Sequence, residues 1–189
     1  LAAKIPCEVR KAGPEDLDLL ARAGFWSRPQ LVQLLRSTTE ICFVAIAEGR
    51  LAGPLWVALG PSDQDFAPLP WPVRLAEREA YCYNSRALRG YRGAGLSAAL
   101  GCAALAWVAG RGVRRAYVSI LERNAASLAL FEKLGFRRAE QVSIRRWMRR
   151  AAIACRRPRL LVSEPIRVLA IGDGSGHESS VMGTLRRSG

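Results

Sequence analysis

Hydrophobic and polar positions along the chain follow two periods, which predict its helices and strands. An apolar run over residues 41–47, rich in β-branched and aromatic side chains, predicts a buried strand. A Glu-Gly-Arg turn follows, and residues 51–59 predict the returning strand of a hairpin, with Pro54 at a bulge or an edge. Apolar residues at helical spacing predict helices over 17–23 and 29–36. A short strand over 8–11 precedes them.

The second half of the chain alternates strands and helices. We expect a strand over 77–88 in which Glu79, Tyr81 and Tyr83 share one face, since side chains of a strand alternate. The helix predicted over 96–109 is apolar almost all round and should therefore be buried. A strand over 116–121, a helix over 125–133 and one or two strands within 136–148 follow, and the proline-rich stretch 61–76 predicts a long loop. Together these elements predict an α/β domain with a mixed sheet.

The composition of the chain changes after residue 148. Arginines gather over 149–159, residues 160–171 could form a strand or two, and a Gly/Ser-rich stretch follows. We therefore predict a domain over 1–148 and an Arg-rich C-terminal extension over 149–189 that is partly flexible.

Charge and cysteine usage exclude several classes of protein. The net charge is +13, almost entirely from arginine, and we interpret most of it as solvated surface while keeping nucleic-acid binding as an alternative. The five cysteines lack Cys-x-x-Cys spacing, which favours free thiols in the cytoplasm. The single histidine, His177, argues against a His-based triad, and we expect no metal site. The longest apolar run is too short to span a membrane.

The candidate chemistry starts at the glycine-rich stretch Tyr91-Arg92-Gly93-Ala94-Gly95-Leu96-Ser97, between a predicted strand and a predicted buried helix. Glycines let a ligand approach the backbone, and the N–H groups of a helix start form an anion site. Arg92 adds a forked donor for phosphate. This stretch alone fits a pyrophosphate site and a tight turn that binds nothing equally well.

Two motifs together resemble the GNAT (GCN5-related N-acetyltransferase) family. Arg92-Gly93-Ala94-Gly95-Leu96-Ser97 is similar to its acyl-CoA loop, and residues 121–136, with Asn124, a helix, an aromatic residue and then Leu-Gly-Phe, look like its second signature. The spacing of one helix and one strand also fits, and the resemblance covers about residues 8–148. It implies an α/β fold with a mixed, mainly antiparallel central sheet flanked by helices.

The resemblance also implies roles for the matching positions. Arg92 and the backbone N–H groups of Gly93, Ala94, Gly95, Leu96 and Ser97 would hold the CoA pyrophosphate. Arg86 and Ala87 would pair with the pantetheine arm as a strand does, and Asn124 would hydrogen-bond the same arm besides capping a helix. Phe131 would either contact CoA or pack in the hydrophobic core. It replaces a tyrosine that many relatives use to protonate the leaving thiolate.

The amine that attacks the thioester arrives protonated and needs a base or a proton wire. Glu79 resembles the strand glutamate that serves as base in histone-acetylating relatives, although an exposed residue at the strand start, paired with arginine, is an alternative. Tyr81 is a second candidate, for proton transfer or positioning.

The function that the resemblance implies is transfer of an acetyl group from acetyl-CoA to a primary amine, by direct attack in a ternary complex. The acceptor is an amine-bearing small molecule or a protein amine. The expected protein is cytoplasmic, without a membrane partner, and a homodimer is left open. Two alternatives remain: a catalytically degenerate acyl-CoA sensor or scaffold, and an Arg-rich nucleic-acid-binding protein.

Overall fold

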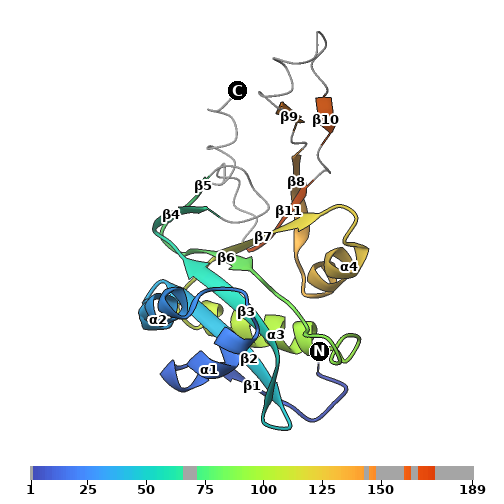
Figure 1. The fold of residues 1–189 in the computed structure, drawn as a ribbon. Helices are drawn as coiled ribbons and strands as arrows, with labels where there is room; N and C mark the ends of the chain where they lie inside the picture. Colours follow the sequence, from blue (N-terminus) through green and yellow to red (C-terminus); the bar gives the residue numbers. More distant parts are fainter. Residues whose placement is uncertain (1, 66–71, 143–144, 148–159, 163–165, 173–189) are drawn as a thin grey trace, which may run out of the picture.

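The computed structural model describes residues 2–65, 72–142, 145–147, 160–162 and 166–172 (Figure 1). The elements follow one another as β1 (Glu8–Lys11), the 3-10 turn η1 (Pro14–Asp16), α1 (Leu17–Arg22), α2 (Arg28–Arg36), β2 (Glu40–Ala47), β3 (Arg50–Leu59), β4 (Ser62–Asp65), β5 (Pro72–Leu75), β6 (Glu79–Tyr83), α3 (Leu96–Ala109), β7 (Arg115–Leu121), α4 (Ala125–Lys133), β8 (Arg137–Val142), β9 (Arg145–Trp147), β10 (Leu160–Val162) and β11 (Ile166–Gly172).

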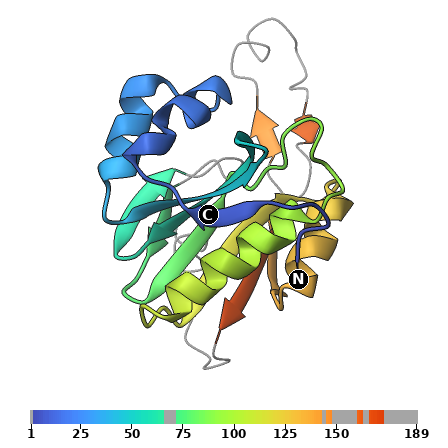
Figure 2. The ribbon, with the colours of Figure 1, turned by 90° about the horizontal axis from the view of Figure 1, so that it is seen from below.

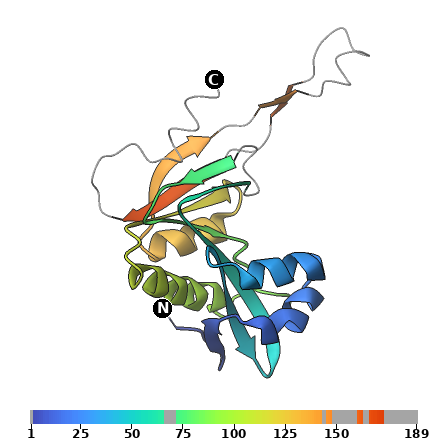
Figure 3. The same cartoon turned by 90° about the vertical axis from the view of Figure 1, so that its left-hand side faces the viewer.

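Within the described residues the main sheet has seven strands in the order β1-β2-β3-β6-β7-β11-β8. Neighbouring strands run antiparallel except β6 and β7, which are parallel. This arrangement confirms the predicted mixed, mainly antiparallel sheet. Helices α3 and α4 lie on one face of the sheet, and α1 and α2 lie on the other (Figures 2 and 3).

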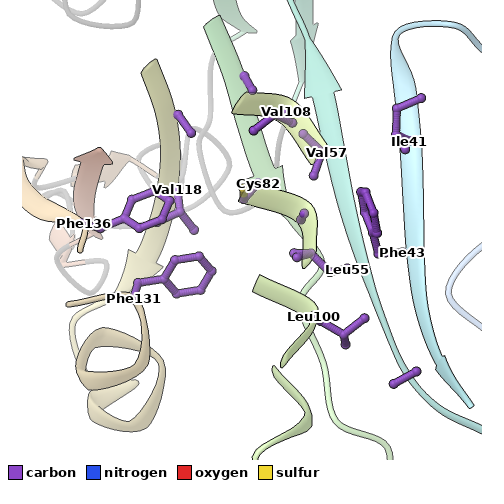
Figure 4. Packing of buried hydrophobic residues seen from close by; sticks show 14 of the residues in the cluster. Ile41, Phe43, Leu55, Val57, Cys82, Leu100, Val108, Val118, Phe131 and Phe136 are labelled. Atoms are coloured by element: carbon purple, nitrogen blue, oxygen red, sulfur yellow. The ribbon is translucent and has the colours of Figure 1, made fainter. Parts of the chain in front are cut away.

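The face of the sheet that α3 covers holds the larger core. Alternate residues of β2, Ile41 and Phe43 among them, point to α3, where they meet buried residues of β3 and of the helix itself. Figure 4 shows Phe131 and Phe136 joining this core from the side of β7. The fully buried residues of α3, Leu96, Leu100, Gly101, Ala104 and Val108, form one face, and most of its other residues are partly buried, so the helix is less enclosed than its apolar sequence predicts.

The opposite face of β2 packs on α1 and α2. Cys42, Val44 and Trp56 are buried there with Leu20 of α1 and Leu31 of α2. Because both faces of β2 and β3 are covered, these strands read as continuous apolar runs rather than alternating ones.

Three stretches differ from the sequence-based expectation. The predicted loop 61–76 contains an antiparallel hairpin, β4 with β5, because Val73 and Leu75 are buried against Tyr81 and Tyr117. The strand predicted over 77–88 is regular only from Glu79 to Tyr83. Pro54, expected at a bulge or an edge, is not among these differences: it lies in β3 close to a bulge that shifts the pairing of β2 with β3 between Ala45 and Ile46.

The third difference concerns the C-terminal extension. Residues 166–172, which the composition assigned to that extension, form β11 between β7 and β8 in the main sheet. Leu169 of β11 is 1% exposed and belongs to the same core as Phe131. A strand or two was expected over 160–171, and the arginine-rich stretch before it led us to place it outside the domain, because the composition shifts before the sheet is complete. Elsewhere in the proposed extension, residues 160–162 form β10, which pairs with β9, and residues 149–159, 163–165 and 173–189 lie outside the described residues.

A buried ion pair fixes the start of the domain and gives the first testable prediction. Asp16 is 1% exposed and accepts two hydrogen bonds from the guanidinium of Arg10, at 2.6 and 2.8 Å, and one from the N–H of Gly13 at 2.9 Å. Burial acts to raise the pKa of Asp16, but these donors outweigh it and hold the pKa below its ordinary value. The folded state therefore gains stability from the carboxylate above the unfolded pKa of about 3.9, and loses it as the pH falls through the lower folded pKa.

Asp16→Asn should lower the free energy of unfolding at neutral pH by about 1–3 kcal/mol, since buried donors lose their charged acceptor. Urea unfolding of both proteins over a pH series measures this, and the difference should shrink once wild-type Asp16 is protonated. Asp18→Asn is the control, because Asp18 pairs with Arg28 at the exposed surface and should matter little. A difference that stays constant down to acid pH would contradict the assignment.

Candidate active site

A cleft opens where the parallel strands β6 and β7 part. Their regular pairing runs from Glu79 with Arg115 to Cys82 with Val118, and it ends there. Asn84 then takes a left-handed backbone conformation, with φ of 48°. The chain beyond it stays with β3, since the N–H groups of Arg86 and Leu88 donate to carbonyls of that strand at 3.1 and 2.8 Å. The resulting β6–β7 cleft has a volume of about 300 Å³ and is lined by Tyr81, Cys82, Tyr83, Asn84, Ser85, Arg86, Val118, Ser119, Ile120, Leu121, Asn124, Ser127 and Phe131.

One wall of this cleft is a strand edge. Because Arg86 and Leu88 direct their N–H groups to β3, the backbones of the alternate residues Ser85 and Ala87 face away from β3. An extended ligand with amide groups can add to such an edge as a further strand. Of the two residues expected to pair with such a ligand, Ala87 therefore faces the open side. The N–H of Arg86 bonds β3 instead, and its guanidinium lies 5.0 Å from the centre of the Phe25 ring.

A second cavity, the loop cavity, lies at the N-terminus of α3 and has a volume of about 200 Å³. Gly93 and Gly95 line it with φ of 77° and 76°, a conformation that glycine adopts without strain. The N–H of Lys4 donates to the carbonyl of Ala94 at 2.8 Å and so supports the loop from behind. The N–H groups at the start of α3, those of Leu96 and Ser97, have no acceptor within the helix and suit an anion.

Helix α4 joins the two cavities, because Ser127 lines both. Asn124 caps this helix: its Oδ1 accepts the N–H of Ser127 at 3.2 Å, as predicted. Its side chain is otherwise exposed at the β6–β7 cleft. Phe131 is 4% exposed and packs edge-to-face on Phe136, with ring centres 5.1 Å apart, so it contributes mainly to the core while bordering the cleft.

The polar groups at the base of the cleft come from β6 and β7. The hydroxyls of Tyr81 and Ser119 hydrogen-bond each other. Burial raises the pKa of Tyr81, so its phenol stays protonated and can donate a hydrogen bond. Burial also raises the pKa of Cys82 to about 12, which leaves that thiol protonated and unsuited to act as a nucleophile. Sequence reasoning missed Ser119 and Ser127, whose small polar side chains carry no pattern of their own.

Glu79 lies at the opposite end of β6 and does not line the cleft. Its carboxylate accepts hydrogen bonds from the hydroxyl of Tyr117 at 2.9 Å and from the N–H of Ala76 at 3.0 Å, and it lies 3.5 Å from the guanidinium of Arg115. The structure thus brings Tyr81, Ala87, Gly93, Gly95 and Asn124 to the two cavities but places Glu79 in an ion-pair cluster. The contact with Arg115 agrees with the arginine pairing considered for Glu79, but the residue is 7% exposed and so is buried rather than exposed as that alternative held.

Comparison with known proteins assigns the domain to the acetyltransferases. The family described as Acetyltransferase (GNAT) matches residues 12–136, well over half of the chain. The chain therefore belongs to the GNAT acetyltransferase family. No curated protein sequence matches it significantly.

Solved structures show the same fold. The ribosomal-protein-S18-alanine N-acetyltransferase of Escherichia coli is 18% identical with a TM-score of 0.60, over 92% of this chain and 97% of that protein. NAA60 of Arabidopsis thaliana in complex with acetyl-CoA is 13% identical with a TM-score of 0.63, over 90% of this chain and all of that one. An acetyltransferase of the GNAT family from Streptococcus pneumoniae gives 15% identity and a TM-score of 0.64, over 88% and 99% of the two chains.

The described residues show neither a cluster of metal-binding side chains nor a membrane-spanning helix. They contain no group of three or more His, Cys, Asp or Glu side chains placed to hold a metal ion. None of their helices combines the length and apolar character needed to cross a bilayer.

Proposed function

We propose that the protein is an acetyl-CoA-dependent N-acetyltransferase that acetylates a primary amine of a small molecule or a protein. The observation that carries this proposal is that the β6–β7 cleft and the loop cavity are neighbours whose walls share Ser127. A strand edge for the amides of pantetheine and a helix N-terminus for the pyrophosphate lie along one path. Arg92, exposed beside the loop, adds positive charge for the phosphates.

The reaction proposed for the cleft is direct attack of the amine on the thioester. The neutral amine nitrogen forms a bond to the acetyl carbon, the carbon–sulfur bond breaks, and CoA leaves as a thiolate. The ammonium form gives up one proton to solvent before the attack, and the nitrogen loses a second proton to solvent as the amide forms. A thiol pKa of about 8.5 lets the thiolate leave without an obligatory acid. This accommodates Phe131 in place of the tyrosine. The protonated state of Cys82 supports a route without an acyl-enzyme.

Tyr81 and Ser119 are the hydroxyl groups that we assign to the reacting centre. A protonated phenol at the base of the cleft can hydrogen-bond the thioester carbonyl as negative charge develops on its oxygen. In this proposal Glu79 does not contact the amine or the thioester, because its carboxylate does not line the cleft.

The experiment that tests the function is thiol release from acetyl-CoA in the presence of a panel of primary amines and N-terminal peptides. Amine-dependent release by the wild-type protein, with the acetylated amine found by mass spectrometry, would support the proposal. Binding of acetyl-CoA without turnover of any amine would instead favour the degenerate sensor, for which Phe131 is the motivating observation.

Asn124 gives a matched pair of variants that separates capping from ligand binding. Asn124→Ala should cost about 1 kcal/mol of stability, because the N–H of Ser127 loses its acceptor, and it should also weaken acetyl-CoA binding. Asn124→Ser keeps a capping oxygen, so its stability should stay within a few tenths of a kcal/mol while affinity falls about tenfold. Urea unfolding and calorimetric titration with acetyl-CoA measure the two effects. Wild-type affinity in Asn124→Ser would limit Asn124 to its capping role.

A further inference from the structure

A third cavity, the Glu40 cavity, lies between α2, the start of β2 and β4, on the face of the sheet opposite α3. Its volume is about 380 Å³, and Trp26, Gln30, Gln33, Leu34, Ser37, Thr39, Glu40 and Gln64 line it. Among these residues Glu40 alone is ionisable, in a protein whose net charge is strongly positive. The cavity therefore combines one negative charge with neutral polar groups.

The carboxylate of Glu40 is incompletely satisfied. Glu40 is 6% exposed, and its Oε2 accepts a hydrogen bond from the hydroxyl of Tyr83 at 2.5 Å. Its Oε1 is buried without a hydrogen-bond partner among the described residues. Burial raises the pKa of Glu40 above its ordinary value. The hydroxyl of Tyr83 and the nearby side chain of Gln64 act to lower this pKa, although Gln64 does not reach hydrogen-bond geometry with Oε1. A buried carboxylate oxygen without a donor costs stability, which points to a ligand that supplies the donor.

The rest of the cavity wall favours an ammonium group as this ligand. Ser37 Oγ already accepts the N–H groups of Thr39 and Glu40, at 3.1 and 2.9 Å, and pairs with the hydroxyl of Thr39, so Glu40 is the acceptor left for a cation. Trp26 offers an aromatic surface, which attracts organic cations. Because one oxygen of Glu40 is occupied by Tyr83, a single N–H donor fits better than the paired donors of a guanidinium group.

Tyr83 links this cavity to the β6–β7 cleft. It lines the cleft and at the same time donates its hydroxyl to Glu40, so one tyrosine separates the free carboxylate oxygen from the space assigned to the reacting centre. We propose that the Glu40 cavity binds a second, distal ammonium group of the acceptor, so that the preferred acceptors are amines with two cationic nitrogens joined by an alkyl chain. The expected preference for diamines as substrates rests on the proposed function. Binding of an ammonium group in the Glu40 cavity does not depend on it.

The test compares α,ω-diamines of increasing length, each with the monoamine in which a methyl group replaces the distal ammonium. We expect the wild-type protein to show at least one diamine whose kcat/KM exceeds that of its monoamine by on the order of 10-fold or more, as one charge-assisted hydrogen bond allows. Glu40→Gln keeps an acceptor for Tyr83 and removes the charge, and it should abolish this preference through a rise in KM for the diamine. Calorimetric titration of the same diamines without acetyl-CoA should show the same loss of affinity.

Glu48→Gln is the matched control, because Glu48 lies exposed in the turn between β2 and β3 and the change in net charge is the same. It should retain the preference for the diamine. Equal kcat/KM for every diamine and its monoamine, together with equal binding by wild type and Glu40→Gln, would overturn the inference. Diamine binding that depends on Glu40, without acetylation of any amine, would support the cation site while contradicting the proposed function. The comparison of diamines with monoamines uses the wild-type protein alone, so it remains informative even if Glu40→Gln fails to fold.

Discussion

A chain that ends at residue 165 is expected to lose cooperative unfolding, whereas a chain that ends at residue 172 should retain it. The two chains differ only in β11, which pairs with β7 on one side and β8 on the other. Without β11 both strands lose a partner, and the core loses Leu169, a residue of the size whose truncation to Ala typically costs about 2–5 kcal/mol. The total approaches the net stability of an ordinary domain, about 5–15 kcal/mol.

Near-ultraviolet circular dichroism and urea unfolding of the two purified chains measure this effect. Leu169→Ala in the longer chain is a milder companion variant, and it should lower the midpoint without abolishing the transition. A cooperative transition with an unchanged denaturant slope in the chain that ends at 165 would show that β11 is dispensable. It would then return the domain boundary to residue 148.

Gly93→Ala should weaken acetyl-CoA binding by about 10- to 100-fold, which corresponds to about 1.4–2.8 kcal/mol. The φ of Gly93 is 77°, and a Cβ built there meets no protein atom within 4 Å. An added methyl group would therefore strain the backbone and project into open space at the loop cavity that Gly93 lines. The strain and the methyl group would each keep a pyrophosphate from coming close to the backbone N–H groups of the loop.

Gly90→Ala is the control for this variant. Gly90 also has a positive φ, 99°, and open space around its Cβ position, but it lines neither the loop cavity nor the β6–β7 cleft. Calorimetric titration of both variants with acetyl-CoA separates backbone strain from ligand contact. Equal losses of affinity in the two variants would assign the effect to strain in the loop, and wild-type affinity in Gly93→Ala would remove Gly93 from the site.

Local patterns in the sequence predicted most elements well, because their causes are local. The hairpin of 41–47 and 51–59 and the buried helix 96–109 follow from apolar runs and turns, and Asn124 follows from its capping preference. The β4–β5 hairpin escaped prediction because its buried residues pack partly against Tyr117, which is distant in the sequence. The strand 77–88 was predicted too long because Asn84 interrupts a pattern that otherwise continues to alternate.

The residues of the candidate site also divide into those that local sequence motifs predicted and those that depend on contacts distant in the sequence. The loop around Gly93 and the cap at Asn124 lie at the cavities, where family motifs pointed. Glu79 matched a family position by its place on a strand, but its partners come from β7 and could not be read from the sequence around it. Glu40 gave no signal, since a single acid before an apolar run is common. Only its contact with Tyr83, 43 residues away, distinguishes it.

The position of β11 also has a consequence for how the protein is made. Strands β7 and β8 are both antiparallel to β11, so they run parallel to each other, with α4 between them in sequence. On the ribosome these three elements emerge first and can pair directly as a β-α-β unit. That pairing must stay open, or reopen, to admit a strand synthesised later. Loop closure over this distance is slower than local folding. The β7 wall of the cleft therefore gains its second neighbour only after residue 172 has been translated.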